Sequence, residues 1–416
     1  MRAIWYLLTK SLFLFLAIKK GEIMRDLLDC RDAIDDIDNK IMQLLQARQE
    51  VARDVAIYKL HHDQGIVDKR REAQKIRTLM DKAIANGISP AMVREIYEKI
   101  MAHTVSYEQS YIVDKINGKE FKRSTSVAYL GTKGTYSHLA THRYFEHYEN
   151  RLSETSCSSF DEIVACVEDG TCEYGVLPIE NSNSGSINEA VDTMQSMDAS
   201  IVGEIFYPID HSILSTMPAP NAENEAIDFS KIKTIYSHPQ PVAQCSKFIK
   251  EFLGHAQIIY TNSSSEAMDI VTKLKDDSAI ALGSKHAARY YDLHSLVSDI
   301  ANNKNNFTRF IILSKIPVDI PKTMAAKTSI LFSTKKYTPG SLIAVLNEFS
   351  QSKINVTKLY SRPLEAKNRD AWEEIFFADV EANLNDPLMQ DILLRIKEHT
   401  TNLKILGCYL SQEHNL

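Results

Sequence analysis

Residues 27–60 read LLDCRDAIDDIDNKIMQLLQARQEVARDVAIYKL and contain neither proline nor glycine. Apolar residues recur here at alternating steps of three and four, at Leu27, Cys30, Ile34, Ile37, Ile41, Leu44, Val51 and Val55. Arg48 occupies the one position of this series that is not apolar. The pattern predicts a single helix about 50 Å long with a coiled-coil-like seam. A small domain cannot cover that length alone, so we expect a long helix from a second copy of the chain to lie against it.

Two further helices are expected after this one. A second helix should run from Asp68 to Ala85 and end at Asn86-Gly87. Ser89-Pro90 is a favourable N-cap and first-turn pair for a third helix that reaches about Ile112. No strand pattern precedes residue 113, so residues 24–112 are predicted to form an all-α domain of three helices. Residues 113–125 are polar and rich in lysine, which is typical of a linker.

Beyond the linker, short apolar runs alternate with helical patterns. We expect strands at 127–130, 174–179, 232–236 and 279–282, each followed by a helix. Residues 126–316 are therefore predicted to form an α/β domain with a largely parallel sheet. Over residues 325–410 the predicted order is strand, helix, strand, strand, helix, strand, the ferredoxin-like βαββαβ arrangement. The predicted fold class is multidomain.

Composition limits the classes of function. The chain has 416 residues, of which 44% are hydrophobic and 25% charged, as in an ordinary globular protein of two to four domains. The net charge is -6 and no long basic run occurs, so nucleic acid is a poor candidate partner. The six cysteines show neither C-x-x-C pairs nor metal-ligand spacing, which favours reduced thiols in the cytoplasm and no metal.

The first 23 residues form an apolar extension. Its longest uninterrupted apolar stretch, residues 12–18, is far shorter than the roughly 20 residues that a membrane helix needs. Either it is a weak signal or anchor, or it is not part of the fold. We prefer the second interpretation, because Met24 directly precedes the first well-patterned helix.

Charged and polar residues occupy particular places on the three helices. They are Arg31, Arg48, Lys59, Asp68, Arg71, Glu72, Thr104 and Glu108. Arg48 and Lys59 share one face of the first helix, whereas Arg31 lies about 25 Å from Arg48 along it. Only a second copy of the chain could bring Arg31 to the same pocket. Solvated helix faces with i,i+4 ion pairs are the plainer interpretation for any one of these residues. A charge at the seam position of Arg48 weakens that interpretation, because a lone buried charge is costly.

These positions, with Lys59-Leu60 and the D-x-x-R-E element at 68–72, resemble the all-helical chorismate mutase domain of bacterial P-proteins. The resemblance implies that Arg48, and Arg31 from a second copy, hold the carboxylates of chorismate. It also implies that Lys59 and Glu108 face the ether oxygen and that Glu72 faces the ring hydroxyl. Thr104 replaces the family's serine, and Glu108 stands where glutamine is common. An ionised glutamate cannot donate a hydrogen bond, so we hypothesise that Glu108 acts protonated and that mutase activity falls as pH rises.

Four elements of the α/β region stand at strand ends. The sequence GTKGTYSH at 131–138 lacks both the P-loop ending and the dinucleotide fingerprint, which argues against a nucleotide site, although a helix N-terminus suits a carboxylate. The others are PIEN at 178–181, SHPQ at 237–240 with Gln244, and NFTRF at 306–310. Singly each could be a turn or a helix cap.

Together and in this order these elements resemble prephenate dehydratase over residues 127–314. The resemblance implies two α/β subdomains, as in periplasmic binding proteins, with the site in the cleft between them. It places Thr308 at the leaving hydroxyl of prephenate, with Arg309 beside it. Glu180, Asn181, Ser237 and Gln244 are the further expected members of the cleft.

PGSLI at 339–343 and YSRP at 360–363 resemble the ligand-binding elements of an ACT domain. The resemblance implies that phenylalanine binds between paired modules, at Gly340, Ser341, Leu342, Ser361, Arg362 and Pro363. Tyr360 stands where the family has glutamate, which leaves the sensitivity to phenylalanine open. The alternative is a module that only dimerises.

The leading expectation is a cytoplasmic, bifunctional enzyme of phenylalanine biosynthesis that acts as a homodimer or higher homo-oligomer. Its partners would be chorismate, prephenate and phenylalanine, with no cofactor, nucleic acid or membrane. The alternative from another class is a catalytically dead, amino-acid-sensing regulator of the same architecture. The presence of Arg48, Lys59, Glu72 and Thr308 argues against it.

Overall fold

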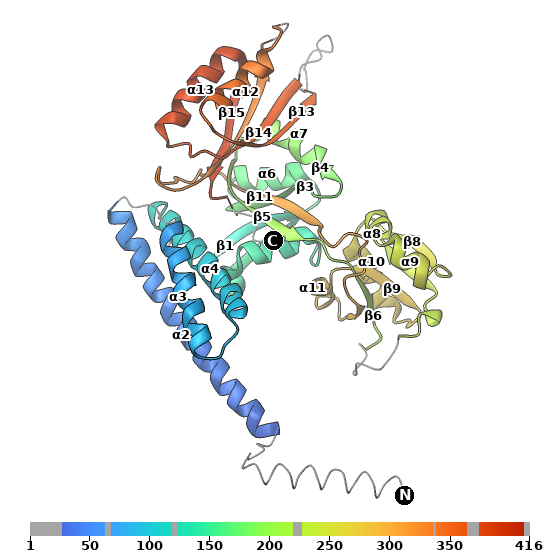
Figure 1. Ribbon diagram of the computed structural model, residues 1–416. Coiled ribbons are helices and arrows are strands. Elements are labelled where there is room, and N and C mark those ends of the chain that lie inside the picture. Colours follow the sequence, from blue (N-terminus) through green and yellow to red (C-terminus); the bar gives the residue numbers. More distant parts are fainter. Residues whose placement is uncertain are drawn as a thin grey trace, which may run out of the picture. The chain divides into compact units, whose positions relative to one another are not determined.

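The computed structural model describes residues 27–62, 68–118, 124–218, 227–335, 338–363 and 374–411. The chain divides into two compact units after Ile112 (Figure 1). The predicted extension at residues 1–23 lies outside the described residues. Every helix in the described ranges falls short of the length or apolar character needed to cross a membrane. All six cysteines are free thiols, as the sequence predicted.

The first unit consists of three helices, and the predicted boundaries agree with it closely. They are α2 (Leu27–His61), α3 (Lys69–Ala85) and α4 (Pro90–Ile116). Asp68 caps α3 by accepting the backbone N–H of Arg71 at 2.9 Å, and Gly87 supplies the positive φ of +69° needed in the turn to α4. Because α4 continues to Ile116, the predicted linker at 113–125 starts too early; residues 119–123 of it lie outside the described ranges.

The seam of α2 is largely exposed within one chain. Ile34, Ile37, Leu44 and Val51 each leave more than half of their surface accessible, at 56%, 53%, 70% and 61%. Only Ala52 and Ala56 of this helix are buried. A row of exposed apolar side chains of this length is typical of a surface that packs against another helix.

The second unit begins with a sheet of strand order β2-β1-β3-β11-β5, with β4 paired to β3. Its strands are β1 (Thr125–Leu130), β2 (Leu152–Cys157), β3 (Tyr174–Asn181), β4 (Gly185–Ser186), β5 (Ser200–Pro208) and β11 (Phe307–Ser314). One apolar core packs the sheet against α5 (Tyr136–Tyr144), and another packs it against α6 (Phe160–Glu168) and α7 (Asn188–Ser196). A short 3-10 helix, η1 (Glu146–Arg151), leads into β2.

A second sheet has the order β10-β6-β9-β7-β8. Its strands are β6 (Ser212–Ser215), β7 (Thr234–Ser237), β8 (Gln257–Tyr260), β9 (Ala279–Gly283) and β10 (His294–Val297). Four helices and a short 3-10 helix accompany it: α8 (Pro239–Gln244), α9 (Ser246–Phe252), α10 (Ser264–Leu274), α11 (Lys285–Ala288) and η2 (Phe229–Lys231). The chain passes from the first sheet to the second after β5 and returns before β11, which gives the two predicted α/β subdomains.

The prediction of a largely parallel sheet is wrong in part. β11 runs antiparallel to both β3 and β5, and β6 runs antiparallel to both β9 and β10. Both sheets are therefore mixed, because the segments that cross between them enter the neighbouring sheet in the opposite direction. This placement puts β11 next to β3 in the middle of the first sheet, which brings together Glu180, Asn181, Thr308 and Arg309.

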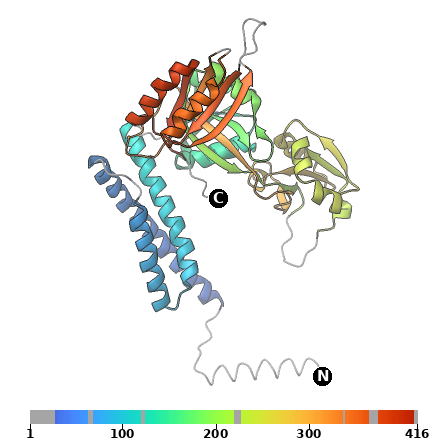
Figure 2. The ribbon, with the colours of Figure 1, turned by 45° about the horizontal axis from the view of Figure 1, so that its top comes forward.

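The C-terminal part has the predicted βαββαβ order, in a sheet β13-β14-β12-β15. Its elements are β12 (Lys327–Thr334), α12 (Ser341–Gln351), β13 (Val356–Pro363), β14 (Glu374–Val380), α13 (Pro387–His399) and β15 (Thr400–Tyr409). Figure 2 shows α12 and α13 along this sheet, and they share one apolar core with Ile330, Phe332 and Val380.

The opposite face of the C-terminal sheet packs on the first α/β subdomain. Leu331, Phe377 and Leu406 belong to the same buried cluster as Leu177 and Ile311 of the first sheet. Strands β15 and β5 approach so closely that a Cβ atom on Gly407 would lie 2.1 Å from the carbonyl oxygen of Ile201. The C-terminal module and this subdomain therefore share one continuous core.

Candidate functional site

A nearly buried ion pair joins α2 and α4 in the helical unit. Lys59 Nζ donates to Glu108 Oε2 at 2.7 Å, and their side chains are only 20% and 7% exposed. The pair lies where the sequence predicted one end of a small-molecule site. Glu108 thus accepts a hydrogen bond from a cation of the same unit, and its acting in protonated form stays a hypothesis.

Arg48 lies on the same face of α2 as Lys59, as predicted. Ala52 and Ala56, which are both buried, continue this face from Arg48 towards Lys59. The Nε atom of Arg48 is buried, and it has no hydrogen-bond partner among the described residues. A buried guanidinium nitrogen without an acceptor is costly, and an anionic ligand would satisfy it.

The other predicted residues of the helical unit make local contacts within their own helix or lie at the surface. Asp68 serves as the N-cap of α3, and Thr104 Oγ1 donates to the backbone oxygen of Ile100 at 2.7 Å. Arg31 and Arg71 are exposed, and Glu72 is half-buried. Within one chain the structure therefore brings Lys59 and Glu108 into contact and leaves Arg31 on the surface, where a second copy could use it.

Thr308 and Asn181 form the centre of the polar group on the first sheet. They are cross-strand partners in the antiparallel pair of β11 and β3. Asn181 Nδ2 donates to Thr308 Oγ1 at 3.0 Å and to Asn306 Oδ1 at 2.8 Å. Because Thr308 accepts in this contact, its own O–H hydrogen remains available for a substrate oxygen.

Asn181 also fixes the turn that follows β3. Its Oδ1 atom accepts the backbone N–H groups of Asn183 and Ser184 at 3.0 and 3.1 Å. Asn181 is 6% exposed, and its hydrogen bonds fix the position of this turn relative to Thr308. The last residue of the predicted PIEN element therefore supports the strand that carries Thr308.

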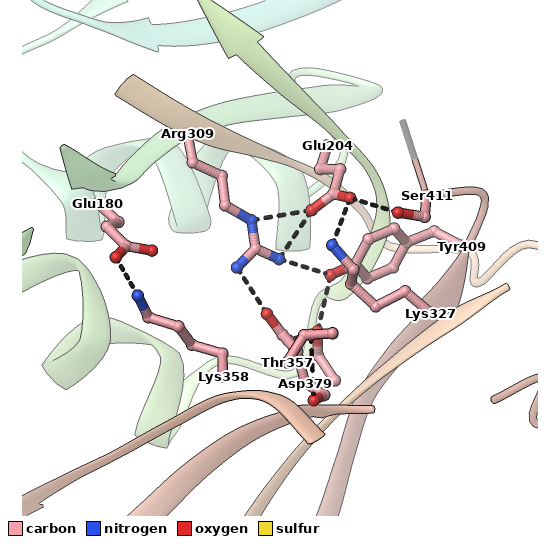
Figure 3. Close-up of polar contacts among 10 residues, drawn as sticks. Glu180, Glu204, Arg309, Lys327, Thr357, Lys358, Asp379, Tyr409 and Ser411 are labelled. Carbon is pink, nitrogen blue, oxygen red and sulfur yellow. Dashed lines mark hydrogen bonds and ion pairs between the residues drawn. The ribbon is translucent and has the colours of Figure 1, made fainter. Parts of the chain in front are cut away.

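Arg309 and Glu180 do not join Thr308, contrary to the prediction. Successive side chains of a strand point to opposite faces of its sheet, and Arg309 and Glu180 follow and precede the central pair. Arg309 donates to Glu204 at 2.8 Å, to Asp379 at 2.5 Å and to Tyr409 at 3.0 Å. Glu180 accepts a hydrogen bond from Lys358 of β13. Both residues therefore face the C-terminal module (Figure 3).

Ser237 and Gln244 belong to the second subdomain. Ser237 is fully buried at the end of β7, and its hydroxyl donates to the backbone oxygen of His238 at 3.0 Å. Gln244 Oε1 lies 2.6 Å from Nε2 of His211, a residue that the sequence analysis missed. The other ring nitrogen of His211 lies 3.3 Å from the hydroxyl of Tyr136 on α5. Gln244 is thus linked to the first subdomain through His211.

The described residues contain one cluster that could in principle hold a metal ion, formed by His138, His142 and Glu154. Glu154 Oε1 lies 3.1 Å from His138 Nε2 and 2.7 Å from His142 Nε2. However, His138 Nδ1 accepts the backbone N–H of Gly134 at 3.2 Å. Burial lowers the pKa of His138 to about 4, and its Nε2 atom is buried without a hydrogen-bond partner among the described residues.

Comparison with known proteins identifies both catalytic parts. The family model described as chorismate mutase type II matches residues 30–109, and the model for prephenate dehydratase matches residues 127–317. A bifunctional chorismate mutase/prephenate dehydratase of Enterobacter agglomerans is 36% identical, over 93% of this chain and 96% of the relative. The chain belongs to the family of bifunctional chorismate mutase/prephenate dehydratases.

Two solved structures resemble the second unit of this family member. One is a prephenate dehydratase from Arthrobacter aurescens in complex with L-Phe, with a TM-score of 0.59 and 23% identity over 69% of this chain and 90% of that one. The other, described as a novel type of quorum-quenching acylase, has the same TM-score and 25% identity over 69% of this chain and 98% of that one. The first of these likenesses shows the fold alone.

In this bifunctional chain the predicted regulatory residues occupy two places. Gly340, with φ +81°, and Ser341 line a half-open surface pocket of about 210 Å³ together with Lys335 and His399. Arg362 instead donates to Asp192 of α7 at 2.9 and 2.6 Å. The remaining positions differ in exposure: Leu342 packs against the module's core, and Ser361 and Pro363 are exposed.

Proposed function

We propose that the chain catalyses two consecutive reactions, chorismate to prephenate in the helical unit and prephenate to phenylpyruvate in the second unit. The observation that carries this proposal is that both catalytic family models match one chain. The pair Lys59–Glu108 lies within the first matched range and the pair Asn181–Thr308 within the second. A dead regulator would have no need to retain both pairs.

The mutase reaction breaks an ether C–O bond and forms a C–C bond without a covalent enzyme intermediate. The helical unit has to fold a dianion into its reactive conformer and stabilise charge on the ether oxygen. Arg48 would hold one carboxylate, which gives its buried Nε atom an acceptor. Lys59 would turn from Glu108 towards the ether oxygen, and Glu72 would bind the ring hydroxyl.

A homodimer completes this pocket. The exposed apolar seam of α2 supports packing against a second copy, and Arg31 lies on the exposed surface of the same helix. A partner helix would bring its own Arg31 to the second carboxylate. Burial of about 25 cal/mol per Å² along a seam of this length supplies a driving force for dimerisation.

The dehydratase reaction removes the ring carboxylate as CO2. The electrons of that C–C bond form a ring double bond while the C4 hydroxyl leaves, and with a proton it becomes water. Aromatisation drives the step, so the protein mainly has to donate a hydrogen bond or proton at C4. Thr308 would donate there, held in place by Asn181. A threonine hydroxyl is a weak acid, so it acts as a positioned donor.

We further propose that the C-terminal module is an ACT domain that binds phenylalanine as a feedback inhibitor. Its βαββαβ order and the pocket beside Gly340 support this assignment. In the domain division we propose, residues 24–112 are the mutase, 126–316 the dehydratase and 325–410 the ACT domain. The free cysteines favour a cytoplasmic location.

Chorismate supplied to the purified chain tests this function directly. We expect prephenate to appear first and phenylpyruvate to follow, both followed by absorbance, and phenylalanine to slow the second step. Phenylpyruvate without any response to phenylalanine would contradict the regulatory part alone. A chain that binds phenylalanine and converts neither substrate would support the regulator instead.

A further inference from the structure

Two cross-strand pairs lie back to back at the end of β3 and β11. Thr308 pairs with Asn181, and Arg309 pairs with Glu180. Because side chains alternate along a strand, the first pair faces the proposed active site and the second faces the C-terminal module. Any displacement of Arg309 and Glu180 along the sheet therefore also displaces the backbone of Thr308 and Asn181.

The C-terminal module supplies an opposite charge to each member of the second pair. Lys358 of β13 binds Glu180, and Asp379 of β14 accepts from Arg309 at 2.5 Å (Figure 3). Tyr409 of β15 adds a contact to Arg309 at 3.0 Å. Asp379 is fully buried, so this contact cannot be exchanged for water without a large cost.

Strand β13 carries three side chains to the same face. Lys358, Tyr360 and Arg362 alternate with more exposed residues, and Arg362 binds Asp192 of the dehydratase. The Tyr360 hydroxyl is buried and has no hydrogen-bond partner among the described residues. Burial, and then the negative charge of Asp379, raises the pKa of Tyr360. The hydroxyl of Tyr360 therefore stays neutral beside the charged residues Asp379 and Arg309.

Strand β13 is also an edge strand, paired only with β14 in its sheet. An edge strand can shift while breaking contacts on one side only. Its C-terminal half carries the Tyr-Ser-Arg-Pro element, which is part of the proposed effector site. The strand is thus connected both to the effector site and to the second pair behind Thr308.

We propose that the Glu180–Arg309 pair transmits the state of the C-terminal module to Asn181 and Thr308, with Lys358 as a positioning residue. This inference rests on the proposed regulation by phenylalanine. Effector binding shifts β13, and Lys358 moves with it. Glu180 follows Lys358, its counter-ion, because separating this ion pair costs more free energy than a small movement of the strand. The Thr308 donor then leaves the position that the reaction requires.

The test uses the full-length variant Lys358→Met. The Lys358 side chain is 30% exposed, so the substitution leaves the core intact. Dehydratase kcat/KM for prephenate, measured without and with saturating phenylalanine, gives a coupling ratio. Allosteric coupling commonly amounts to a factor of about 5–150, and we expect the variant to reduce the ratio at least fivefold. Phenylalanine binding, measured by calorimetry, should change less than threefold.

Two further variants sharpen the test. Lys273→Met removes a cation of an exposed pair with Asp269 on α10 and should leave the coupling ratio unchanged. Tyr409→Phe removes one contact to Arg309 and should weaken coupling in the same direction as Lys358→Met. Wild-type coupling in both Lys358→Met and Tyr409→Phe would overturn the inference while leaving the proposed function intact. A wild-type chain that neither binds nor responds to phenylalanine would overturn the proposed regulation and this inference together.

Discussion

Replacing Arg309 by methionine should destabilise the second unit strongly. Arg309 and Lys327 face Glu204 and Asp379 in one buried group of two positive and two negative charges. Glu204 and Asp379 have fully buried side chains. The variant leaves a net charge of one in the core, and removing one partner of a buried pair costs about 3–5 kcal/mol. Because Glu204 keeps Lys327 as a partner, most of this cost should arise at Asp379.

Hydrogen exchange measured by mass spectrometry locates the effect. In Arg309→Met, peptides from β11 and β14 should lose about 3–5 kcal/mol of protection, whereas peptides from α2 should keep theirs. Lys273→Met, which removes an exposed ion pair with Asp269 on α10, is the control and should cost less than about 1 kcal/mol. A loss below about 1 kcal/mol in Arg309→Met would refute the argument that this group holds the module and the sheet together.

Three further expectations concern both units. If Glu108 acts protonated, as hypothesised, Glu108→Gln supplies a hydrogen-bond donor that cannot ionise, so mutase activity should fall less at high pH than in wild type. An identical alkaline loss in both pH profiles would contradict this hypothesis. Burial lowers the pKa of His211 below its ordinary 6.5, so the unfolded chain binds this proton more readily than the folded chain and stability should fall as pH drops below 6.5. In His211→Gln the midpoint of urea unfolding should therefore depend less on pH between pH 8 and 5. The same pH dependence in the variant and in wild type would contradict this cause. Mixing Arg31→Ala with Arg48→Ala subunits should restore about a quarter of wild-type mutase activity, since half of the dimers are hybrids with one intact site. No recovery from folded subunits would refute the shared pocket.

The starts of the three helices in the first unit were predictable almost to the residue because their signals are local, whereas the end of α4 was not. The periodicity from Leu27, the cap at Asp68 and the Ser89-Pro90 start each act within one turn of helix, and the structure has the boundaries they indicate. The same holds for the βαββαβ order of the C-terminal part.

The direction in which individual strand residues face could not be read from their motifs. The TRF element pointed to Thr308 and Arg309 together, but strand alternation separates them, and the partners of Arg309 come from β5, β14 and β15. Glu204 and Asp379 each occur in an apolar run without any motif. His211 had no pattern around it either. Long-range charge pairing of this kind leaves no local signal in a single sequence.

Strands β2 and β6 are two of the several strands that were missed, and for a related reason. β2 reads LSETSC and β6 reads SILS, too polar or too short to be told from loops. Their place in the sheets is set by pairing with other strands: β2 pairs with β1, the strand before it, and β6 pairs with β9, which lies far along the chain.

The account depends on one chain running two reactions at two separate sites, and Thr308→Ala supplied with chorismate tests it most directly. At neutral pH we predict that this variant accumulates prephenate at the wild-type rate while phenylpyruvate formation falls roughly 100- to 10,000-fold. Phenylpyruvate formed as fast as in wild type would contradict the role of Thr308. Loss of both activities in a folded variant would contradict the separation of the two sites.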